Sequence, residues 1–367
     1  MVTIPQHILN LAPYKPGKPG ANMFGNHPPE KQVVLSSNEN NFGPSPKAQK
    51  ALSEAINTLH LYPDPTSSVL KEKLSSKLQV PVSNLLLSNG SDAILYTMFK
   101  AFVQKDESML TSHGAFVSAK VMARMNDVRC VEVPMLKGYE FDLDGFLQAI
   151  DETTKLIYIV NPNNPTGRMV SLEKMVAFLD RVPSHILVVI DEAYFEFAHK
   201  ISDEYPDCTK LDYQNIIVLR TFSKAYGLAG LRLGYAIGPE YLIQALTKVK
   251  LTFDPNLAAQ IAGSAALEDE DFLQKTLDNN SEQMIKLMNA YAELGIKAIP
   301  SVANFIALEM KDESMVEYYY ENLLKKGVLT RRLASFGLPN CLRISIGLPE
   351  ENSYMLRMLE KVVSESQ

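Results

Sequence analysis

The sequence lacks the cysteine and histidine patterns that mark several classes of protein. Its 367 residues include three cysteines, Cys130, Cys208 and Cys341, which lie far apart and form no CxxC pair. A zinc ribbon or a disulfide framework is therefore not expected, and a reducing compartment suits the chain best. The six histidines show neither an HExxH motif nor paired spacing, which argues against a metal-dependent enzyme.

Long runs of basic or apolar residues are also missing. The chain has 36 basic and 42 acidic residues, a net charge of −6 at pH 7, so neither nucleic acid nor an anionic membrane is expected as the main partner. The strongest apolar runs, such as residues 186–190, are far too short to span a bilayer. The first residues lack the basic and apolar regions of a signal peptide. We therefore expect a cytoplasmic protein that does not enter a membrane.

Short apolar runs alternate with amphipathic stretches from residue 33 to about residue 238. The runs lie at residues 85–87, 108–110, 156–160, 187–190, 216–219 and 234–237, and helix-like segments between them include 92–103 and 171–180. This alternation predicts βαβ units and a mainly parallel sheet. A helical stretch and a second, shorter alternation follow. The pattern predicts an N-terminal arm at 1–30, a large domain at 31–265 and a smaller α+β domain at 266–367.

Polar residues follow several of these predicted strands, at the sheet edge where ligands bind in α/β folds. After residues 85–87, Gly90, Ser91 and Asp92 lead into a predicted helix, whose free N–H groups and dipole suit a phosphate. The same pattern is typical of an ordinary capped helix. After residues 156–160 come two Asn-Pro pairs, which form either a plain turn or a loop that brings an asparagine amide into a site.

The next two strand ends carry ionisable groups. Asp191 ends the run at 187–190, either as a helix cap or as a buried carboxylate that needs a cationic partner, and Tyr194 follows three residues later. Lys224 stands just past the run at 216–219 among small and apolar residues, eight positions before Arg232. Burial and a nearby cation would lower its pKa, as a Schiff-base lysine requires. The alternative is a surface lysine on a glycine-rich loop.

Together these strand ends supply an anion cradle, an amide donor, a buried carboxylate, a phenol, a lysine and an arginine. Pyridoxal phosphate needs all of these groups: the lysine for a covalent link, the carboxylate for its ring nitrogen, and the anion cradle for its phosphate. The protein's part in such a site is positioning and electrostatics. The sequence therefore predicts pyridoxal phosphate as the cofactor.

Three motifs carry a resemblance to a known family. NPNNPTG at 161–167, DEAY at 191–194 and TFSKAYGLAGLRLGY at 221–235 resemble the signature of fold-type I pyridoxal-phosphate aminotransferases. Further segments at 12–19, 35–46, 62–64 and 327–347 are similar to the histidinol-phosphate aminotransferase family, so the likeness covers nearly the whole chain. It implies a mainly parallel central sheet in a large cofactor-binding domain, and a smaller α+β C-terminal domain packed with the N-terminal arm.

The resemblance also implies roles for individual residues. Its expected catalytic residues are Lys224, Asp191 and Tyr194. Its expected cofactor-binding residues are Ser91, Asp92, Phe116, Asn164, Asp191, Tyr194, Ser223, Lys224 and Arg232, with Tyr62 reaching the phosphate of the neighbouring subunit's cofactor. Its expected substrate-binding residues are Tyr14, Asn40, Arg331 and Arg343. The family's ring-stacking tyrosine is missing from residues 111–116, so Phe116 is the first candidate for that role and His113 the second.

The implied reaction is transamination of L-histidinol phosphate with 2-oxoglutarate, giving imidazole acetol phosphate and glutamate in histidine biosynthesis. Arg331 with Arg343 would bind a phosphate in one half-reaction and a carboxylate in the other, whereas Arg332 is expected to pair with a surface carboxylate. The alternatives are an aromatic amino acid aminotransferase and, less favoured, a threonine-phosphate decarboxylase. A homodimer is implied, because Tyr62 would complete the partner's site. We do not expect a non-catalytic, cofactor-binding transcription regulator, because the N-terminal arm is too short and not basic enough to supply a DNA-binding domain. A nicotinamide-dependent oxidoreductase is not expected either, because the glycines at 227, 230 and 234 do not have the dinucleotide-binding spacing.

Overall fold

A seven-stranded sheet dominates the computed structural model, which describes residues 2–11 and 29–366. Its strand order is β2-β8-β7-β6-β5-β3-β4. The strands are β2 (Leu85–Ser88), β3 (Ser108–Ser112), β4 (Arg129–Val133), β5 (Thr154–Val160), β6 (Leu187–Asp191), β7 (Ile216–Thr221) and β8 (Gly234–Ile237). β8 runs antiparallel to β2 and β7, and the other neighbouring pairs are parallel. The predicted mainly parallel sheet is confirmed.

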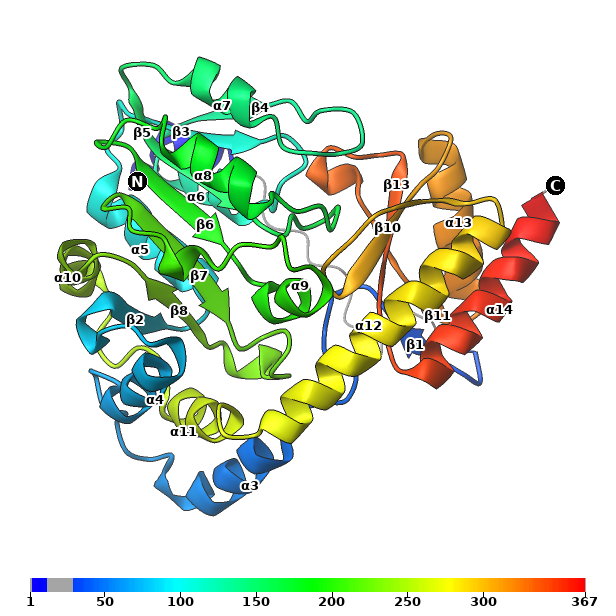
Figure 1. The fold of residues 1–367 in the computed structure, drawn as a ribbon, viewed down its shortest axis with the longest axis horizontal. Helices are drawn as coiled ribbons and strands as arrows, with labels where there is room; N and C mark the ends of the chain where they lie inside the picture. Colours follow the sequence, from blue (N-terminus) through cyan, green and yellow to red (C-terminus); the bar gives the residue numbers. More distant parts are fainter. Residues whose placement is uncertain (1, 12–28, 367) are drawn as a thin grey trace.

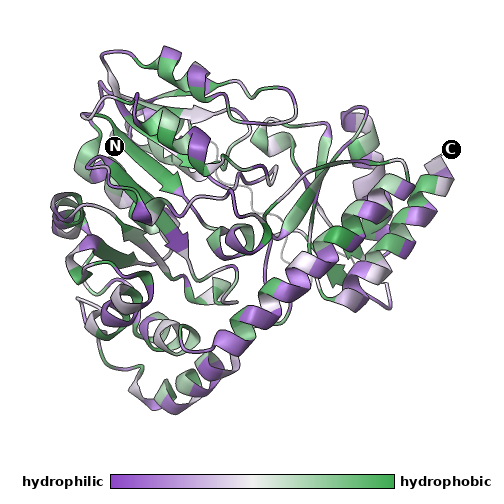
Figure 2. Ribbon diagram, in the orientation of Figure 1, coloured by the Kyte–Doolittle hydropathy of each residue, from purple (hydrophilic) through white to green (hydrophobic). Residues whose placement is uncertain are grey.

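Helices cover both faces of this sheet (Figure 1). The helices that belong to this part of the chain are α3 (Pro46–Ala55), α4 (Ser68–Leu78), α5 (Ser91–Phe102), α6 (Ser118–Met125), α7 (Leu143–Ala149), α8 (Leu172–Leu179), α9 (Phe195–Ile201), α10 (Glu240–Val249) and α11 (Leu257–Ala266). Because both faces are covered, every residue of β6 and β7 is buried, and these strands are largely hydrophobic up to their polar carboxyl ends (Figure 2). Among the described residues, none of the helices has the length and apolar character needed to cross a membrane.

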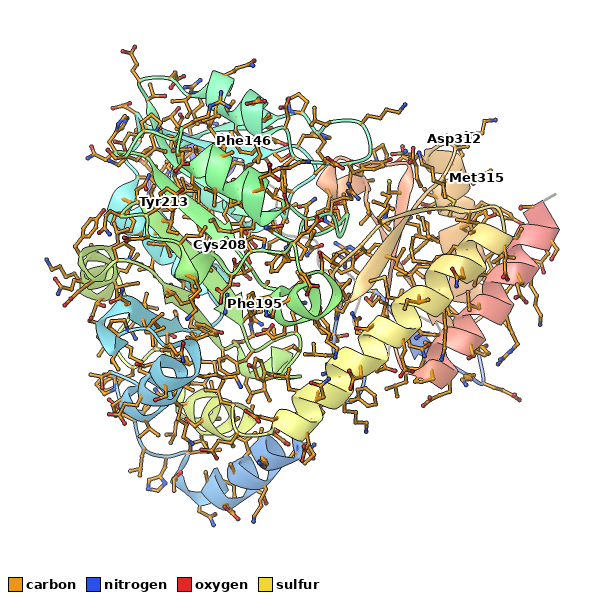
Figure 3. All side chains as sticks on the ribbon, in the orientation of Figure 1. Phe146, Phe195, Cys208, Tyr213, Asp312 and Met315 are labelled. Atoms are coloured by element: carbon orange, nitrogen blue, oxygen red, sulfur yellow. The ribbon has the colours of Figure 1, made fainter. Side chains whose placement is uncertain are left out.

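A second, four-stranded sheet has its own core. Its order is β12-β13-β10-β9, with β9 (Lys297–Ile299), β10 (Phe305–Glu309), β12 (Arg331–Arg332) and β13 (Cys341–Ser345). The helices α13 (Glu313–Lys325) and α14 (Pro349–Ser366) pack beside it. The N-cap of α13 is Asp312, which accepts a hydrogen bond from the backbone N–H of Met315 at 2.9 Å (Figure 3).

The long helix α12 (Glu270–Glu293) runs from the end beside α3 and α11 to the side of α14 and the second sheet (Figure 1). We propose a domain boundary near residue 265, which falls at the end of α11. The short helix α1 (Gln6–Leu9) lies against α6.

The N-terminal side of the predicted large domain is placed differently from expectation. β1 (Val33–Val34) pairs in parallel with β11 (Val328–Leu329), and Val33 and Leu35 are buried in the core of the second sheet. The prediction assigned residues from 31 onward to the large domain, because apolar periodicity does not reveal which core a two-residue strand joins. The chain therefore crosses the second core first and then enters the large sheet.

Candidate functional site

A cavity of about 810 Å³ lies where the carboxyl ends of the large sheet's strands face the second sheet. Its walls come from the loop before α3, the N-terminus of α5, the ends of β5, β6 and β7, and the strands β12 and β13. The residues that line it include Ser36, Ser37, Asn38, Ser91, Asp92, Phe116, Asn164, Asp191, Tyr194, Ser223, Lys224, Arg232, Arg331, Arg332 and Arg343. Residues far apart in the sequence thus meet at one place.

One end of the cavity is an anion cradle. Ser91 and Asp92 begin α5, so unpaired backbone N–H groups and the positive end of the helix dipole face the cavity. Arg232 extends toward them: its Nη1 lies 3.4 Å from Ser223 Oγ and its Nη2 lies 3.8 Å from Asp92 Oδ2. Gly90 adopts φ +88°, and a Cβ there would stand 2.9 Å from Arg232 Nη2. The glycine therefore lets the guanidinium reach the helix start.

Asp191 presents a buried carboxylate at the end of β6. Its Oδ2 accepts a hydrogen bond from Tyr158 Oη at 2.6 Å, and its Oδ1 accepts one from the backbone N–H of Ala193 at 3.1 Å. Burial raises the pKa of Asp191 to about 6, although the Tyr158 hydrogen bond opposes this rise. No cation of the described residues forms an ion pair with this carboxylate. A protonated ring nitrogen of a cofactor is the partner that would fit it.

Lys224 lies half-buried between β7 and the loop before α3. Its Nζ donates a hydrogen bond to the carbonyl of Ser37 at 3.2 Å and lies 5.6 Å from the centre of the Tyr194 ring. Burial, together with the nearby cations Arg343 and Arg232, lowers the pKa of Lys224 to about 8. The lysine is therefore a far better nucleophile and base near neutral pH than an ordinary surface lysine.

Tyr194, the N-cap residue of α9, contacts the second sheet. Its hydroxyl accepts a hydrogen bond from Asn38 Nδ2 at 3.0 Å, and its ring packs edge-on against Phe305 of β10 at 5.2 Å between ring centres. Burial raises the pKa of Tyr194 to about 12, so the phenol stays protonated. Asn38 has φ +57° and also exchanges hydrogen bonds with Ser345 of β13. This asparagine ties Tyr194 to the second sheet.

Two arginines approach from the second sheet. Arg331 of β12 stands directly opposite Arg343 of β13, and paired residues share one face of a sheet. Arg343 is buried; its Nη2 donates to the carbonyl of Ser36 at 2.7 Å, and its Nη1 donates to Asn164 Oδ1. Burial lowers the pKa of Arg343 to about 10, and its Nε has no hydrogen-bond partner among the described residues. An anionic ligand would satisfy both observations.

The structure brings most of the predicted site residues to this cavity. Phe116 lines it, whereas His113, the second candidate for ring stacking, does not. Asn40 lies elsewhere: its Nδ2 donates to the Ala225 carbonyl at 3.0 Å and to Thr276 Oγ1 at 3.1 Å. Tyr62 is 80% exposed and stacks on Phe253. Tyr14 lies outside the described residues.

The arginine next in sequence to Arg331 points to a different partner. Arg332 forms an ion pair with Glu317 of α13 and lies 4.2 Å from the centre of the Tyr320 ring. This agrees with its predicted role as the partner of a surface carboxylate. Of the two neighbours, Arg331 is the one without an ion pair among the described residues, and it is left to meet a ligand.

Sequence reasoning missed Asn38, Tyr158 and the carbonyls of Ser36 and Ser37. The sequence pattern does not distinguish Asn38 from Asn40, which lies two residues later in the same segment and is the asparagine that the resemblance indicates. Tyr158 lies within the predicted buried strand at 156–160, where an apolar pattern does not single it out. A buried tyrosine hydroxyl needs a hydrogen-bond partner, so a tyrosine in such a strand does indicate a polar group nearby. The backbone carbonyls carry no signal in the sequence.

The groups present fit pyridoxal phosphate: an anion cradle, a phenol, an amide, a lysine of lowered pKa, and a buried carboxylate that no cation of residues 2–11 or 29–366 pairs with. The family model for aminotransferase class I and II matches residues 30–359. The chain is 39% identical over 363 residues to a histidinol-phosphate aminotransferase of Akkermansia muciniphila, covering 98% of each chain. It is 38% identical over 364 residues to that of Halalkalibacterium halodurans, covering 99% of this chain and 97% of the relative.

Solved structures agree with these sequence relatives. The crystal structure of histidinol-phosphate aminotransferase from Sinorhizobium meliloti in complex with pyridoxal-5'-phosphate is 29% identical, with a TM-score of 0.92 over 100% of this chain and 99% of that chain. An aspartate aminotransferase from Thermus thermophilus, 24% identical and with a TM-score of 0.81 over 90% of this chain and 92% of that chain, shows the likeness of fold alone.

Proposed function

Because the chain belongs to the histidinol-phosphate aminotransferases, within the class I and II aminotransferase family, we propose that it transfers the amino group of L-histidinol phosphate to 2-oxoglutarate. The products are imidazole acetol phosphate and glutamate, a step of histidine biosynthesis, and the cofactor is pyridoxal phosphate. The resemblance drawn from the sequence motifs is confirmed, as is the fold it implied. One observation carries the proposal: a lysine of lowered pKa, a buried carboxylate with no cation partner among the described residues, and two opposed arginines face the same cavity.

The residues of the cavity divide the work of holding the cofactor. Ser223, Arg232 and the backbone N–H groups of Ser91 and Asp92 would bind its phosphate, and Asp191 would hold the proton on its ring nitrogen. Tyr194 and Asn164 would donate hydrogen bonds to its ring oxygen, and Phe116 would stack on its ring. When bound, pyridoxal phosphate supplies an electron sink that stabilises the negative charge left on the substrate carbon after a proton leaves it.

Lys224 serves as the base that moves this proton. With a pKa of about 8, roughly one tenth of its Nζ amines are unprotonated at neutral pH, enough for general base catalysis. With the cofactor bound, Nζ would accept the proton that leaves the substrate carbon and would hold it for return. The neighbouring cations Arg343 and Arg232 keep the amine from holding that proton too tightly.

Arg331 and Arg343 bind the acidic group of each substrate. A guanidinium binds a phosphate or a carboxylate with two parallel hydrogen bonds, so the same pair serves the phosphate monoester and the dicarboxylate in turn. Arg343 is held by Ser36 and Asn164, which fixes its position before a substrate arrives.

We also propose a homodimer. Apolar side chains are exposed in the segment that contains Tyr62, and Tyr62 stacks on the exposed Phe253. The exposed residues are Ile56, Leu59, Leu61, Val69, Leu251 and Phe253. An exposed apolar group of this kind is typical of a protein interface, and a second copy covering it would bring Tyr62 toward the partner's cofactor phosphate. Size measurement by light scattering would give twice the 40.9 kDa chain mass; a monomer would refute the dimer.

The cytoplasm is the proposed location, supported by three cysteines that form no disulfide.

Steady-state assays test the reaction. The protein should convert histidinol phosphate with 2-oxoglutarate at a kcat/KM at least tenfold above that for phenylalanine. The reverse preference would identify an aromatic aminotransferase, and release of carbon dioxide from threonine phosphate would identify a decarboxylase. The matched control is Arg332→Gln, which removes an arginine already paired with Glu317 and should leave the preference unchanged.

A further inference from the structure

Tyr158 has a hydroxyl for which the reaction described above has no use. It lies on β5, is completely buried, and donates its hydrogen bond to Asp191 Oδ2 at 2.6 Å. We propose that Tyr158 is a positioning residue that keeps Asp191 ionised and aimed at the cofactor's ring nitrogen. The proposal rests on the proposed function, because it needs a cofactor whose ring nitrogen meets Asp191.

The sheet register explains why Tyr158 reaches this carboxylate. β5 and β6 pair in parallel with Tyr158 opposite Val189 and Val160 opposite Asp191. Side chains two residues apart on a strand share a face, so Tyr158 lies diagonally behind Asp191 on the same face. Its long side chain spans the remaining gap. A phenylalanine would fill the same space, so the hydroxyl is needed for the hydrogen bond and not for packing.

The surroundings of Asp191 otherwise favour its neutral form. The titratable groups that influence its charge are Asp92 on α5, Tyr158 on β5, and Glu192 and Tyr194 just after β6. Glu192 forms an ion pair at 2.7 Å with the buried Arg220, and the Arg220 guanidinium lies over the Phe195 ring. Burial raises the pKa of Asp191, and Asp92 and Glu192 raise it further, whereas the hydrogen bond from Tyr158 lowers it.

The two hydrogen bonds to Asp191 also fix its orientation. The backbone N–H of Ala193 holds Oδ1 and Tyr158 holds Oδ2, so the plane of the carboxylate is set before the cofactor binds. A hydrogen bond to an ionised group contributes more than one between neutral groups. Removal of the hydroxyl should therefore change both the charge and the aim of Asp191.

Tyr158→Phe tests this in the cofactor-free protein, where no substrate is involved. Loss of one charge-assisted hydrogen bond should make Asp191 bind its proton about tenfold more tightly, which raises its pKa by about 1. The folded-state pKa of Asp191 already lies above its unfolded value of 3.8, so stability is present at low pH and is lost as the pH rises through the folded pKa. Because the variant's pKa is higher, its loss of stability continues to higher pH. The Tm of the variant should therefore fall further below that of the native protein as the pH rises from about 5 to about 8.

Tyr291→Phe is the matched control, because Tyr291 is a buried tyrosine of the second core whose hydroxyl has no partner among the described residues. It should show no such pH-dependent loss. A Tm difference for Tyr158→Phe that is the same at every pH would mark a structural role and overturn the proposal. This result is independent of which substrate the enzyme prefers.

The cofactor-loaded protein gives a second readout. The pH midpoint of the cofactor's absorbance change should move in Tyr158→Phe in the same direction as in Asp191→Asn, while Tyr291→Phe leaves it unmoved. In the Asp191→Asn background, Tyr158→Phe should add nothing, because both changes act through one carboxylate. An equal shift in both backgrounds would show that Tyr158 acts elsewhere and would overturn the proposal.

Discussion

The lowered pKa of Lys224 gives a direct prediction for the cofactor-free protein. Burial of Nζ, with Arg343 and Arg232 nearby, brings its pKa from 10.5 to about 8. At pH 7 a lysine of pKa 10.5 has about one unprotonated amine in 3,000, whereas a pKa of about 8 leaves roughly one in ten. The fraction of free amine at pH 7 should therefore be about 300 times that of an ordinary lysine, and Lys224 should react faster than an ordinary lysine with an amine-acylating reagent.

Brief labelling across a pH series, followed by mass spectrometry of the peptide that contains Lys224, measures this pKa. The exposed Lys50 on α3 serves as the internal reference for the reagent. The labelling rate of Lys224 should be half-maximal near pH 8. A midpoint near 10.5, the ordinary lysine value, would refute the argument that the cavity favours the free amine.

A substitution separates the effect of charge from that of burial. Lys224 and Arg343 donate to the adjacent carbonyls of Ser37 and Ser36, so removal of the arginine charge should raise the Lys224 midpoint toward higher pH. Arg343→Gln makes this change, and Arg332→Gln is its control, since Arg332 is already neutralised by Glu317. Equal midpoints in the two variants would show that burial alone sets the pKa.

Three further outcomes are expected. Lys224→Ala should abolish transamination, and borohydride should no longer fix cofactor to the protein; cofactor fixed in that variant would assign the covalent link to another residue. Arg232→Gln should weaken cofactor binding about tenfold or more, measured by equilibrium dialysis, because a charged phosphate contact is lost. Gly227→Ala should lower Tm by more than Gly138→Ala: both glycines have positive φ, but only at Gly227 would a Cβ lie 2.2 Å from a backbone oxygen, that of Gly43. Equal losses would show that φ alone matters.

Much of the site was predictable because its residues follow strand ends. Asp191 and Lys224 each stand next to a run of buried residues, and parallel strands bring their carboxyl ends to one edge. No knowledge of distant contacts was needed to expect them together. The same logic failed to single out Asn38, which lies in an irregular segment and faces the cavity because its backbone takes φ +57° and Ser345 holds it. Neither cause is local in the sequence.

The remaining contacts depend on register. Tyr158 meets Asp191 because β5 and β6 align Val160 with Asp191, and Arg331 joins Arg343 because β12 and β13 align these two. A shift of one residue in either pair would turn the side chain to the opposite face. The register of the large sheet thus places Tyr158 beside Asp191, and the register of the small sheet places Arg331 beside Arg343. Because the two registers are set in separate sheets, a substitution in β12 should leave the contact between Tyr158 and Asp191 in place.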